Sequence, residues 1–145
     1  MSTDDTSQSL TIASELTAAR QVEQHLITQL RQRNCPQDIL FAIRLALEEA
    51  LSNAIKHGNG LDPSKTVTVE FSVGPDELCI VVTDQGAGFD PSGVPDPTTD
   101  DHLEQPNGRG IMLMRAYMDQ VDYNSRGNEV RMVKRIRHST SKQAG

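Results

Sequence analysis

The segment from Glu49 to Lys56 carries polar side chains at spacings that could line a pocket. Residues four apart lie on the same face of a helix, so Glu49 lies one turn from Asn53, and Lys56 lies a further turn along. Together they form a polar stripe beside the apolar face of a predicted helix, with Glu48 turned toward solvent. A carboxylate and an amide on such a stripe can act on a bound ligand. The alternative is a solvated face with no ligand.

A second candidate site follows an apolar strand, where residues 84–88 read Asp-Gln-Gly-Ala-Gly. Asp84 stands at the end of the strand, where a partly buried carboxylate needs hydrogen-bond donors. An exocyclic amine such as that of adenine supplies one. Gly86 and Gly88 allow the backbone to turn and to come close to a flat ligand. The alternative is a strand-ending turn without a ligand.

A third cluster places glycines on both sides of an arginine, in Gly108-Arg109-Gly110, just before a predicted helix. The unpaired N–H groups and the dipole at a helix start favour an anion, and the guanidinium of Arg109 suits phosphate oxygens. Leu113 stands where the dinucleotide-binding fingerprint has its third glycine, and no strand leads in, so this is not that fingerprint. The sequence contains no P-loop motif either.

Hydrophobic periodicity predicts the elements that position these clusters. A helix capped by Ser14 or Thr17 runs to residue 34, and a second helix opens at Pro36 and stops at Gly58. The remaining predicted elements are strands at 10–13, 67–73, 78–83, 121–124 and 129–136 and a helix at 109–118. These elements predict an α+β chain in the form of a two-layer α/β sandwich, with helices packed on one face of a mainly antiparallel mixed sheet.

Length and composition limit the functional classes. The chain has 145 residues and a net charge of −6. One domain over residues 10–137, with flexible segments at 1–9 and 138–145, is the expected organisation. The acidic balance argues against nucleic-acid binding, and no apolar run is long enough to span a membrane. The isolated Cys35 and Cys79 favour reduced thiols in a cytoplasmic protein.

In this order along the chain, the three clusters resemble the N, G1 and G2 boxes of the GHKL ATPase superfamily, whose domain is the Bergerat fold. The segment from Asp119 to Arg135 and the small size of the chain are similar to one branch, the stand-alone bacterial anti-sigma-factor serine/threonine kinases. The resemblance covers residues 10–137. It implies that the three clusters form one nucleotide site.

The resemblance implies ATP or ADP and Mg²⁺ as cofactors. It implies that Asn53 ligates the magnesium ion, that Asp84 binds the adenine amino group, and that Glu49 polarises the attacking hydroxyl of a partner's serine. Residues 89–107 would form a lid over the ATP. The residues implied to contact the nucleotide are Asn53, Asp84, Gly86, Gly88, Gly108, Arg109 and Gly110.

The implied function is that of an ATP-dependent protein serine/threonine kinase acting as an anti-sigma factor. It would phosphorylate an anti-anti-sigma protein of the STAS type, sequester a sigma factor and pair as a homodimer. The alternative is a non-catalytic nucleotide-binding module that holds its partners. An ATP domain cut from a histidine-kinase receptor is disfavoured, because nothing before residue 10 could form the phosphoacceptor hairpin.

Three further assignments weigh a structural role against a functional one. His57 is better explained as a histidine near the C-terminal helix dipole than as a pocket residue. Arg20 is better explained as a solvated arginine than as a partner contact. The apolar run from Met112 to Met114 is better explained as core than as a binding groove.

Overall fold

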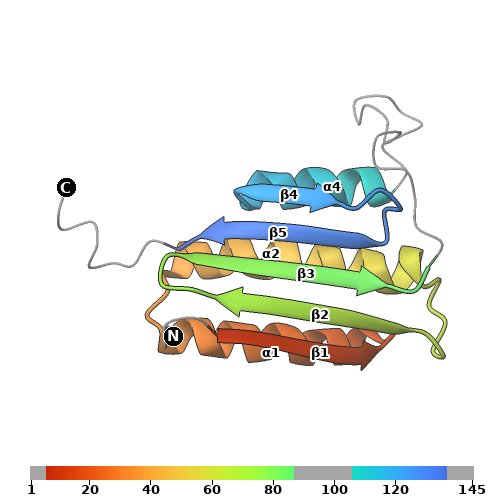
Figure 1. The fold of residues 1–145 in the computed structure, drawn as a ribbon, viewed down its shortest axis with the longest axis horizontal. Coiled ribbons are helices and arrows are strands. Elements are labelled where there is room, and N and C mark those ends of the chain that lie inside the picture. The colour runs from red at the N-terminus through yellow and green to blue at the C-terminus, as the bar shows by residue number, and fades with distance from the viewer. Residues whose placement is uncertain (1–5, 87–105, 137–145) are drawn as a thin grey trace.

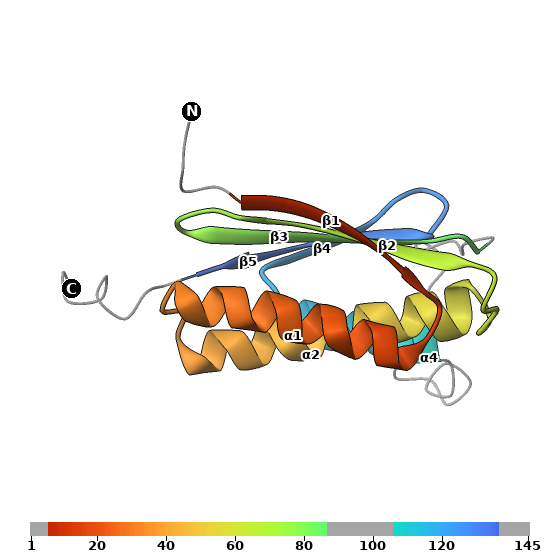
Figure 2. The same cartoon turned by 90° about the horizontal axis from the view of Figure 1, so that it is seen from below.

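The computed structural model describes residues 6–86 and 106–136 as two layers, a five-stranded sheet with helices on one of its faces (Figures 1 and 2). The strand order is β1-β2-β3-β5-β4, and all four pairings are antiparallel. The predicted α+β sandwich is confirmed, and the described part of the sheet contains no parallel pair. The strands are β1 (Thr6–Ala13), β2 (Thr66–Val73), β3 (Glu77–Asp84), β4 (Gln120–Tyr123) and β5 (Glu129–Arg135).

The two hairpins place three strand ends at one end of the sheet. Val67 near the start of β2 pairs with Asp84 at the end of β3, and Thr83 pairs with Glu129 at the start of β5. Figure 1 shows these ends beside the C-terminal end of the second long helix, which contains Glu49. The candidate site that contains Asp84 must therefore lie at this end of the sheet, since Asp84 is the last residue of β3.

The helices follow the predicted periodicity with one difference. They are α1 (Leu16–Gln32), α2 (Gln37–Ser52), η1 (Asn53–Gly58) and α4 (Pro106–Tyr117). The predicted second helix ends as a π-helix, η1, in place of continuing as an α-helix to Gly58. Its wider turn is seen where Asn59 donates its backbone N–H to the carbonyl of Ala54, five residues earlier, at 2.8 Å. Such insertions often occur at functional sites.

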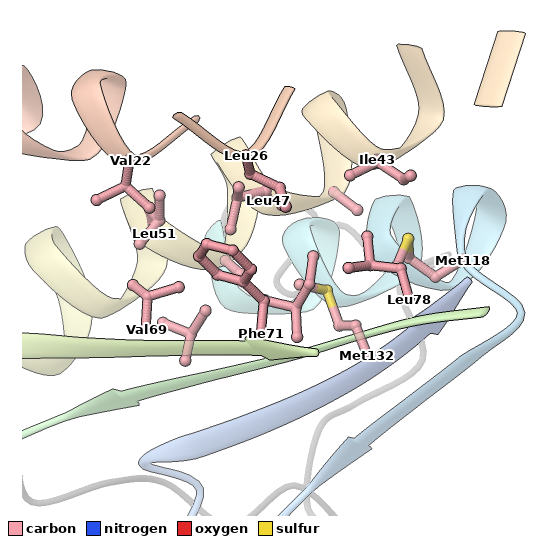
Figure 3. Packing of buried hydrophobic residues seen from close by; sticks show 14 of the residues in the cluster. Val22, Leu26, Ile43, Leu47, Leu51, Val69, Phe71, Leu78, Met118 and Met132 are labelled. Carbon is pink, nitrogen blue, oxygen red and sulfur yellow. The ribbon is translucent and has the colours of Figure 1, made fainter. Parts of the chain in front are cut away.

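One hydrophobic core lies between the sheet and the helices. Val67, Val69, Phe71 and Val73 alternate along β2 and are all buried, as the period of two predicts. Figure 3 shows Phe71 in the middle of this core, facing α1 and α2. The α1 and α2 side chains in the core include Val22, Leu26, Leu30, Ile43, Leu47 and Leu51. Met114 of α4 is buried, whereas Met112 is 53% exposed, so the predicted core role holds for only part of that run.

Two predictions about the N-terminal region are wrong. β1 begins at Thr6 instead of residue 10, because Thr6 to Ser9 pair with β2 in the same register as the rest of the strand. Neither Ser14 nor Thr17 caps α1, whose N-cap position is Glu15 without a side-chain cap. Ser14 is instead buried and donates its hydroxyl to the carbonyl of Lys65 at 3.0 Å.

Among the described residues, no helix has the length and apolar character needed to cross a membrane. Residues 1–5, 87–105 and 137–145 lie outside the described part of the chain. The predicted lid at 89–107 falls almost entirely there, as do the predicted flexible segment at 138–145 and most of that at 1–9.

Candidate functional site

A cleft lies where η1, the end of β3 and the turn between β4 and β5 meet. It brings together Asn53 and Asp84, which the sequence placed in two separate clusters. His57 also lines the cleft, although the sequence favoured a role as a helix-end histidine. Tyr123 and Asn128 complete its wall from the side of β4 and β5. With Glu129 also in its lining, the cleft is bordered by two carboxylate residues, two amides, an imidazole and a phenol.

Asp84 presents its carboxylate at the end of β3 while its backbone is held on both sides. Its N–H donates to the carbonyl of Asn128 at 2.9 Å, and the Asn128 side chain donates to the carbonyl of Asp84 at 3.3 Å. Among the described residues, Gly86 alone donates to the carboxylate, from its N–H to Oδ1 at 2.8 Å. Burial raises the pKa of Asp84, and the Gly86 hydrogen bond opposes this effect. The carboxylate thus has unused acceptor capacity.

Two glycines fit closely around this carboxylate. A Cβ atom at Gly58 would fall on the carboxylate of Asp84, and a Cβ atom at Gly86 would fall on the carbonyl of Gly58. The predicted close backbone approach at Gly86 is thereby seen, but here it is made to Asp84 and Gly58. The sequence analysis assigned Gly58 only to a helix end, since nothing in its local pattern indicates that the end of β3 lies against it.

Asn53 stands at the start of η1 with its side-chain amide turned into the protein. Its Nδ2 atom is buried and makes no hydrogen bond of good geometry among the described residues, although the Asn53 side chain lies near enough to Tyr123 to lower the pKa of that phenol. A buried donor without a partner costs about 1–3 kcal/mol, so a ligand that satisfies this amide gains that energy. Because the amide oxygen and nitrogen exchange places by a half-turn of the group, the same side chain can offer an oxygen to a hard cation.

Tyr123 is a residue of the cleft that the sequence analysis missed. Burial of its phenol, together with the negative charges of Asp84 and Glu49, raises the pKa of Tyr123 to about 12. Like an ordinary tyrosine, the phenol is neutral at physiological pH, and its raised pKa keeps it protonated to higher pH. The short strand containing Tyr123 has no chemical motif, so only the tertiary structure reveals this role.

Glu49 does not line the same cleft as Asn53. It is half-buried and borders a neighbouring hollow of about 450 Å³, together with Ser52, Lys56 and Leu113. Glu48 is exposed as predicted but lies at the rim of this same hollow. The predicted single polar stripe is thus divided, with Asn53 in the cleft and Glu49 and Lys56 in the hollow beside it.

The third cluster is placed only in part. α4 begins at Pro106, three residues earlier than predicted, so Gly108 lies in its first turns together with Arg109 and Gly110, instead of preceding the helix. Proline is favoured at a helix start, and the first four N–H groups of a helix have no partner within it. The backbone of Gly108 and Arg109 therefore still belongs to an anion-favouring helix start. Gly88 lies outside the described residues.

Comparison with known proteins identifies a family for this arrangement. A model of the histidine kinase-like ATPase domain matches residues 12–134. The anti-sigma F factor of Clostridium perfringens strain SM101 is 37% identical over 90 residues, which cover 60% of this chain and 64% of that protein. The serine-protein kinase RsbW of Bacillus licheniformis is 37% identical over 87 residues, which cover 54% of this chain and 53% of that protein.

A solved structure of the RsbU and RsbW domains of a Mycobacterium tuberculosis protein has the same fold. It matches 91% of this chain and 33% of its own chain, with a TM-score of 0.59. At 16% sequence identity this likeness concerns the fold alone. The family match, in contrast, covers most of the sequence and includes the helix with Asn53 and the strand end with Asp84. The chain belongs to the family of histidine kinase-like ATPase domains, within the GHKL superfamily that its three motifs resemble.

Proposed function

We propose that this chain binds Mg-ATP in the cleft between Asn53 and Asp84 and transfers the γ-phosphoryl group to a serine or threonine of a partner protein. The observation that carries the proposal is the meeting of three features in one cleft. These are a carboxylate with free acceptor capacity, a buried amide without a partner, and glycine backbones packed around the carboxylate. Membership of an ATPase domain family implies ATP as the ligand.

Asp84 would bind the adenine end of the nucleotide. Its carboxylate can accept a hydrogen bond from the exocyclic amine while Gly86 continues to donate to Oδ1. Such a bond replaces the hydrogen bonds with water that a carboxylate loses when it is buried. The close approach of Gly58 and Gly86 would hold the Asp84 carboxylate in place for the base, with Gly88 proposed as a further contact.

Asn53 would supply a protein ligand to the magnesium ion. The described residues contain no group of three or more His, Cys, Asp or Glu side chains that could hold a metal by themselves. This fits Mg²⁺, which commonly takes one or two protein oxygens and completes its shell with phosphate oxygens and water. The unpartnered amide of Asn53 is suited to that single contact.

The phosphate end would lie toward the start of α4. Gly108 would contact the phosphates there through a free N–H group of the first helical turn, and Arg109 through its guanidinium, with Gly110 proposed as a further contact. Phosphoryl transfer depends mainly on positioning and charge neutralisation, and a cation and a helix start supply both.

Glu49 would act on the attacking hydroxyl. Its place at the hollow beside the cleft leaves space for a partner's side chain to enter next to the phosphates. The serine oxygen would bond to the γ-phosphorus as the bond to the bridging oxygen of ADP breaks. The hydroxyl proton would pass to the Glu49 carboxylate.

The relatives suggest the partners. Because relatives are named anti-sigma F factor and serine-protein kinase RsbW, we propose that this chain sequesters a sigma factor and phosphorylates an anti-anti-sigma protein of the STAS type. A homodimer is the proposed assembly. These partners are inferred from the relatives, whereas the nucleotide cleft is inferred from residues of this chain.

The test is phosphoryl transfer from labelled ATP to a purified STAS-domain protein in the presence of Mg²⁺. The wild-type chain should label the STAS protein on serine or threonine. Glu49→Ala should reduce transfer by at least about 100-fold while retaining ATP binding. Glu48→Ala is the matched control, since Glu48 is exposed at the rim of the same hollow and should transfer normally. Nucleotide binding without transfer by the wild type would indicate the non-catalytic module instead.

A further inference from the structure

We propose that Asn59 is a positioning residue that sets the orientation of Asp84 toward the nucleotide base. The inference rests on the proposed nucleotide site and extends it to a residue outside the cleft lining. Asn59 is only 2% exposed. Its side chain forms hydrogen bonds with residues of three segments that are far apart in the sequence, at Ser14, Thr66 and Gln85.

Every hydrogen-bonding atom of the Asn59 amide is used. Oδ1 accepts from the backbone N–H of Gln85 at 2.8 Å, directly after Asp84. Nδ2 donates to the carbonyl of Thr66 at 2.9 Å and to the hydroxyl of Ser14 at 2.7 Å. A buried amide with all three of its bonds made is costly to replace and has one well-defined orientation.

The turn after Asp84 is fixed by a second bond within the same network. The side chain of Gln85 accepts from the backbone N–H of Thr66 at 2.7 Å. Gln85 is thus tied to Asn59 by its backbone and to the start of β2 by its side chain. Because Gly86 follows Gln85 and donates to the Asp84 carboxylate, these bonds also set the direction of that donor.

Asn59 also connects this turn to the opposite wall of the cleft. Its backbone N–H donates to the carbonyl of Ala54, within the π-helix that begins at Asn53. It directly follows Gly58, whose backbone lies against the Asp84 carboxylate. One residue therefore fixes the turn carrying Asp84 relative to the helix carrying Asn53.

This arrangement predicts a defect in base recognition that a general loss of stability would not produce. The hydrogen bond from adenine to Asp84 depends on the direction of the carboxylate. Contacts with the phosphates depend on other elements. Purine riboside triphosphate, which carries a hydrogen atom in place of the exocyclic amine, measures binding without that hydrogen bond. The ratio of the two dissociation constants therefore reports on the orientation of Asp84.

The experiment compares the wild type with Asn59→Ala, Asn59→Asp and Ser72→Ala. Asn59→Asp keeps the acceptor for the Gln85 N–H and tests rescue. Ser72→Ala is the control, since it removes a side-chain hydrogen bond between β2 and β1, made to Ser7 at 3.0 Å, outside this network. For each protein, the dissociation constants of Mg-ATP and of Mg-purine riboside triphosphate are measured by calorimetry. Hydrogen exchange at the Gln85 and Gly86 amides is measured without nucleotide.

We expect the wild type and Ser72→Ala to bind Mg-ATP about tenfold more tightly than the analogue that lacks the amine. A tenfold difference in dissociation constant corresponds to about one good hydrogen bond. In Asn59→Ala the preference should fall to within about twofold of unity, and the Gln85 and Gly86 amides should exchange at least about tenfold faster. Asn59→Asp keeps the acceptor for the Gln85 N–H but turns a second carboxylate oxygen toward the Thr66 carbonyl, so it should recover only part of the preference.

Equal weakening of both nucleotides in Asn59→Ala, or unchanged exchange at Gln85 and Gly86, would overturn the inference. A wild type that binds neither nucleotide would contradict the proposed function instead. In that case the exchange measurement alone still decides whether Asn59 positions the turn.

Discussion

Gly58, at the end of the π-helix, lies so close to Asp84, at the end of β3, that a side chain at Gly58 would occupy the space of the carboxylate. The contact joins the helix carrying Asn53 to the strand carrying Asp84, and it leaves the carboxylate facing the cleft. The proposed nucleotide site depends on this close approach of a backbone to a charged group.

Gly58→Ala is therefore expected to disrupt the site. Placing a methyl group against the carboxylate should destabilise the protein by about 1–3 kcal/mol and should abolish ATP binding. Urea unfolding and calorimetry measure the two effects. The control is a double-mutant cycle with Asp84→Ala, which removes the atoms nearest to the new Cβ. If Gly58→Ala costs the same stability in both backgrounds, the contact with Asp84 is not the cause.

Asp84→Asn should make the nucleotide-free protein more stable at neutral pH. Burial raises the pKa of Asp84 above its ordinary value of 3.8, so the folded state binds a proton more tightly than the unfolded state. The stability contributed by the protonated group is present below pH 3.8 and is lost as the pH rises through the raised pKa.

Thermal unfolding of wild type and Asp84→Asn across pH 3 to 8 tests this sign. Asp84→Asn should melt at a higher temperature than the wild type near pH 7. The difference between the two melting temperatures should become smaller as the pH falls. It should also bind ATP more weakly. A variant that melts lower than the wild type at pH 7 would mean that the ionised carboxylate stabilises the fold.

Phe71 and Phe41 should differ strongly in their contribution to stability. Phe71 is 2% exposed at the centre of the core (Figure 3), whereas Phe41 of α2 is 58% exposed. Phe71→Ala should cost about 3–5 kcal/mol, since it removes buried area and leaves a cavity. Phe41→Ala should cost less than about 1 kcal/mol, mainly through its edge contact with Tyr117. Chemical denaturation measures both, and similar losses would show that the core is placed incorrectly.

Tyr123 should ionise at an unusually high pH. The sequence has two tyrosines, so in Tyr117→Phe the ultraviolet absorbance of phenolate reports on Tyr123 alone. We expect an apparent pKa of about 12 in the folded protein and about 10 in denaturant. The stability that the neutral phenol contributes should be present below pH 10 and lost toward pH 12. A folded-state value near 10 would show that the phenol is open to solvent.

The sequence predicted those features that depend on short-range pattern. The alternation from Val67 to Val73 predicts a half-buried strand, and the polar end of the next apolar run predicts Asp84 as a strand-terminal carboxylate. Both follow from a period of two and from the cost of burying charge. The motif order was sufficient to place Asn53 and Asp84 in one site.

Features that depend on tertiary contacts were missed. Ser14 has the chemistry of a helix cap, but its hydroxyl is bonded to Asn59 and Lys65 instead. The π-helix from Asn53 to Gly58 has no sequence signature, and local pattern does not show that Asn53 and Glu49 line different cavities. A residue such as Asn59, whose partners lie in three other segments, becomes visible only once those segments are assembled.

The most direct test is a crystal structure of the protein with Mg²⁺ and a non-hydrolysable ATP analogue. The account predicts the adenine amino group within about 2.7–3.2 Å of the Asp84 carboxylate and an Asn53 side-chain oxygen about 2.1 Å from the metal. A nucleotide bound elsewhere, or one whose base does not contact Asp84, would contradict it.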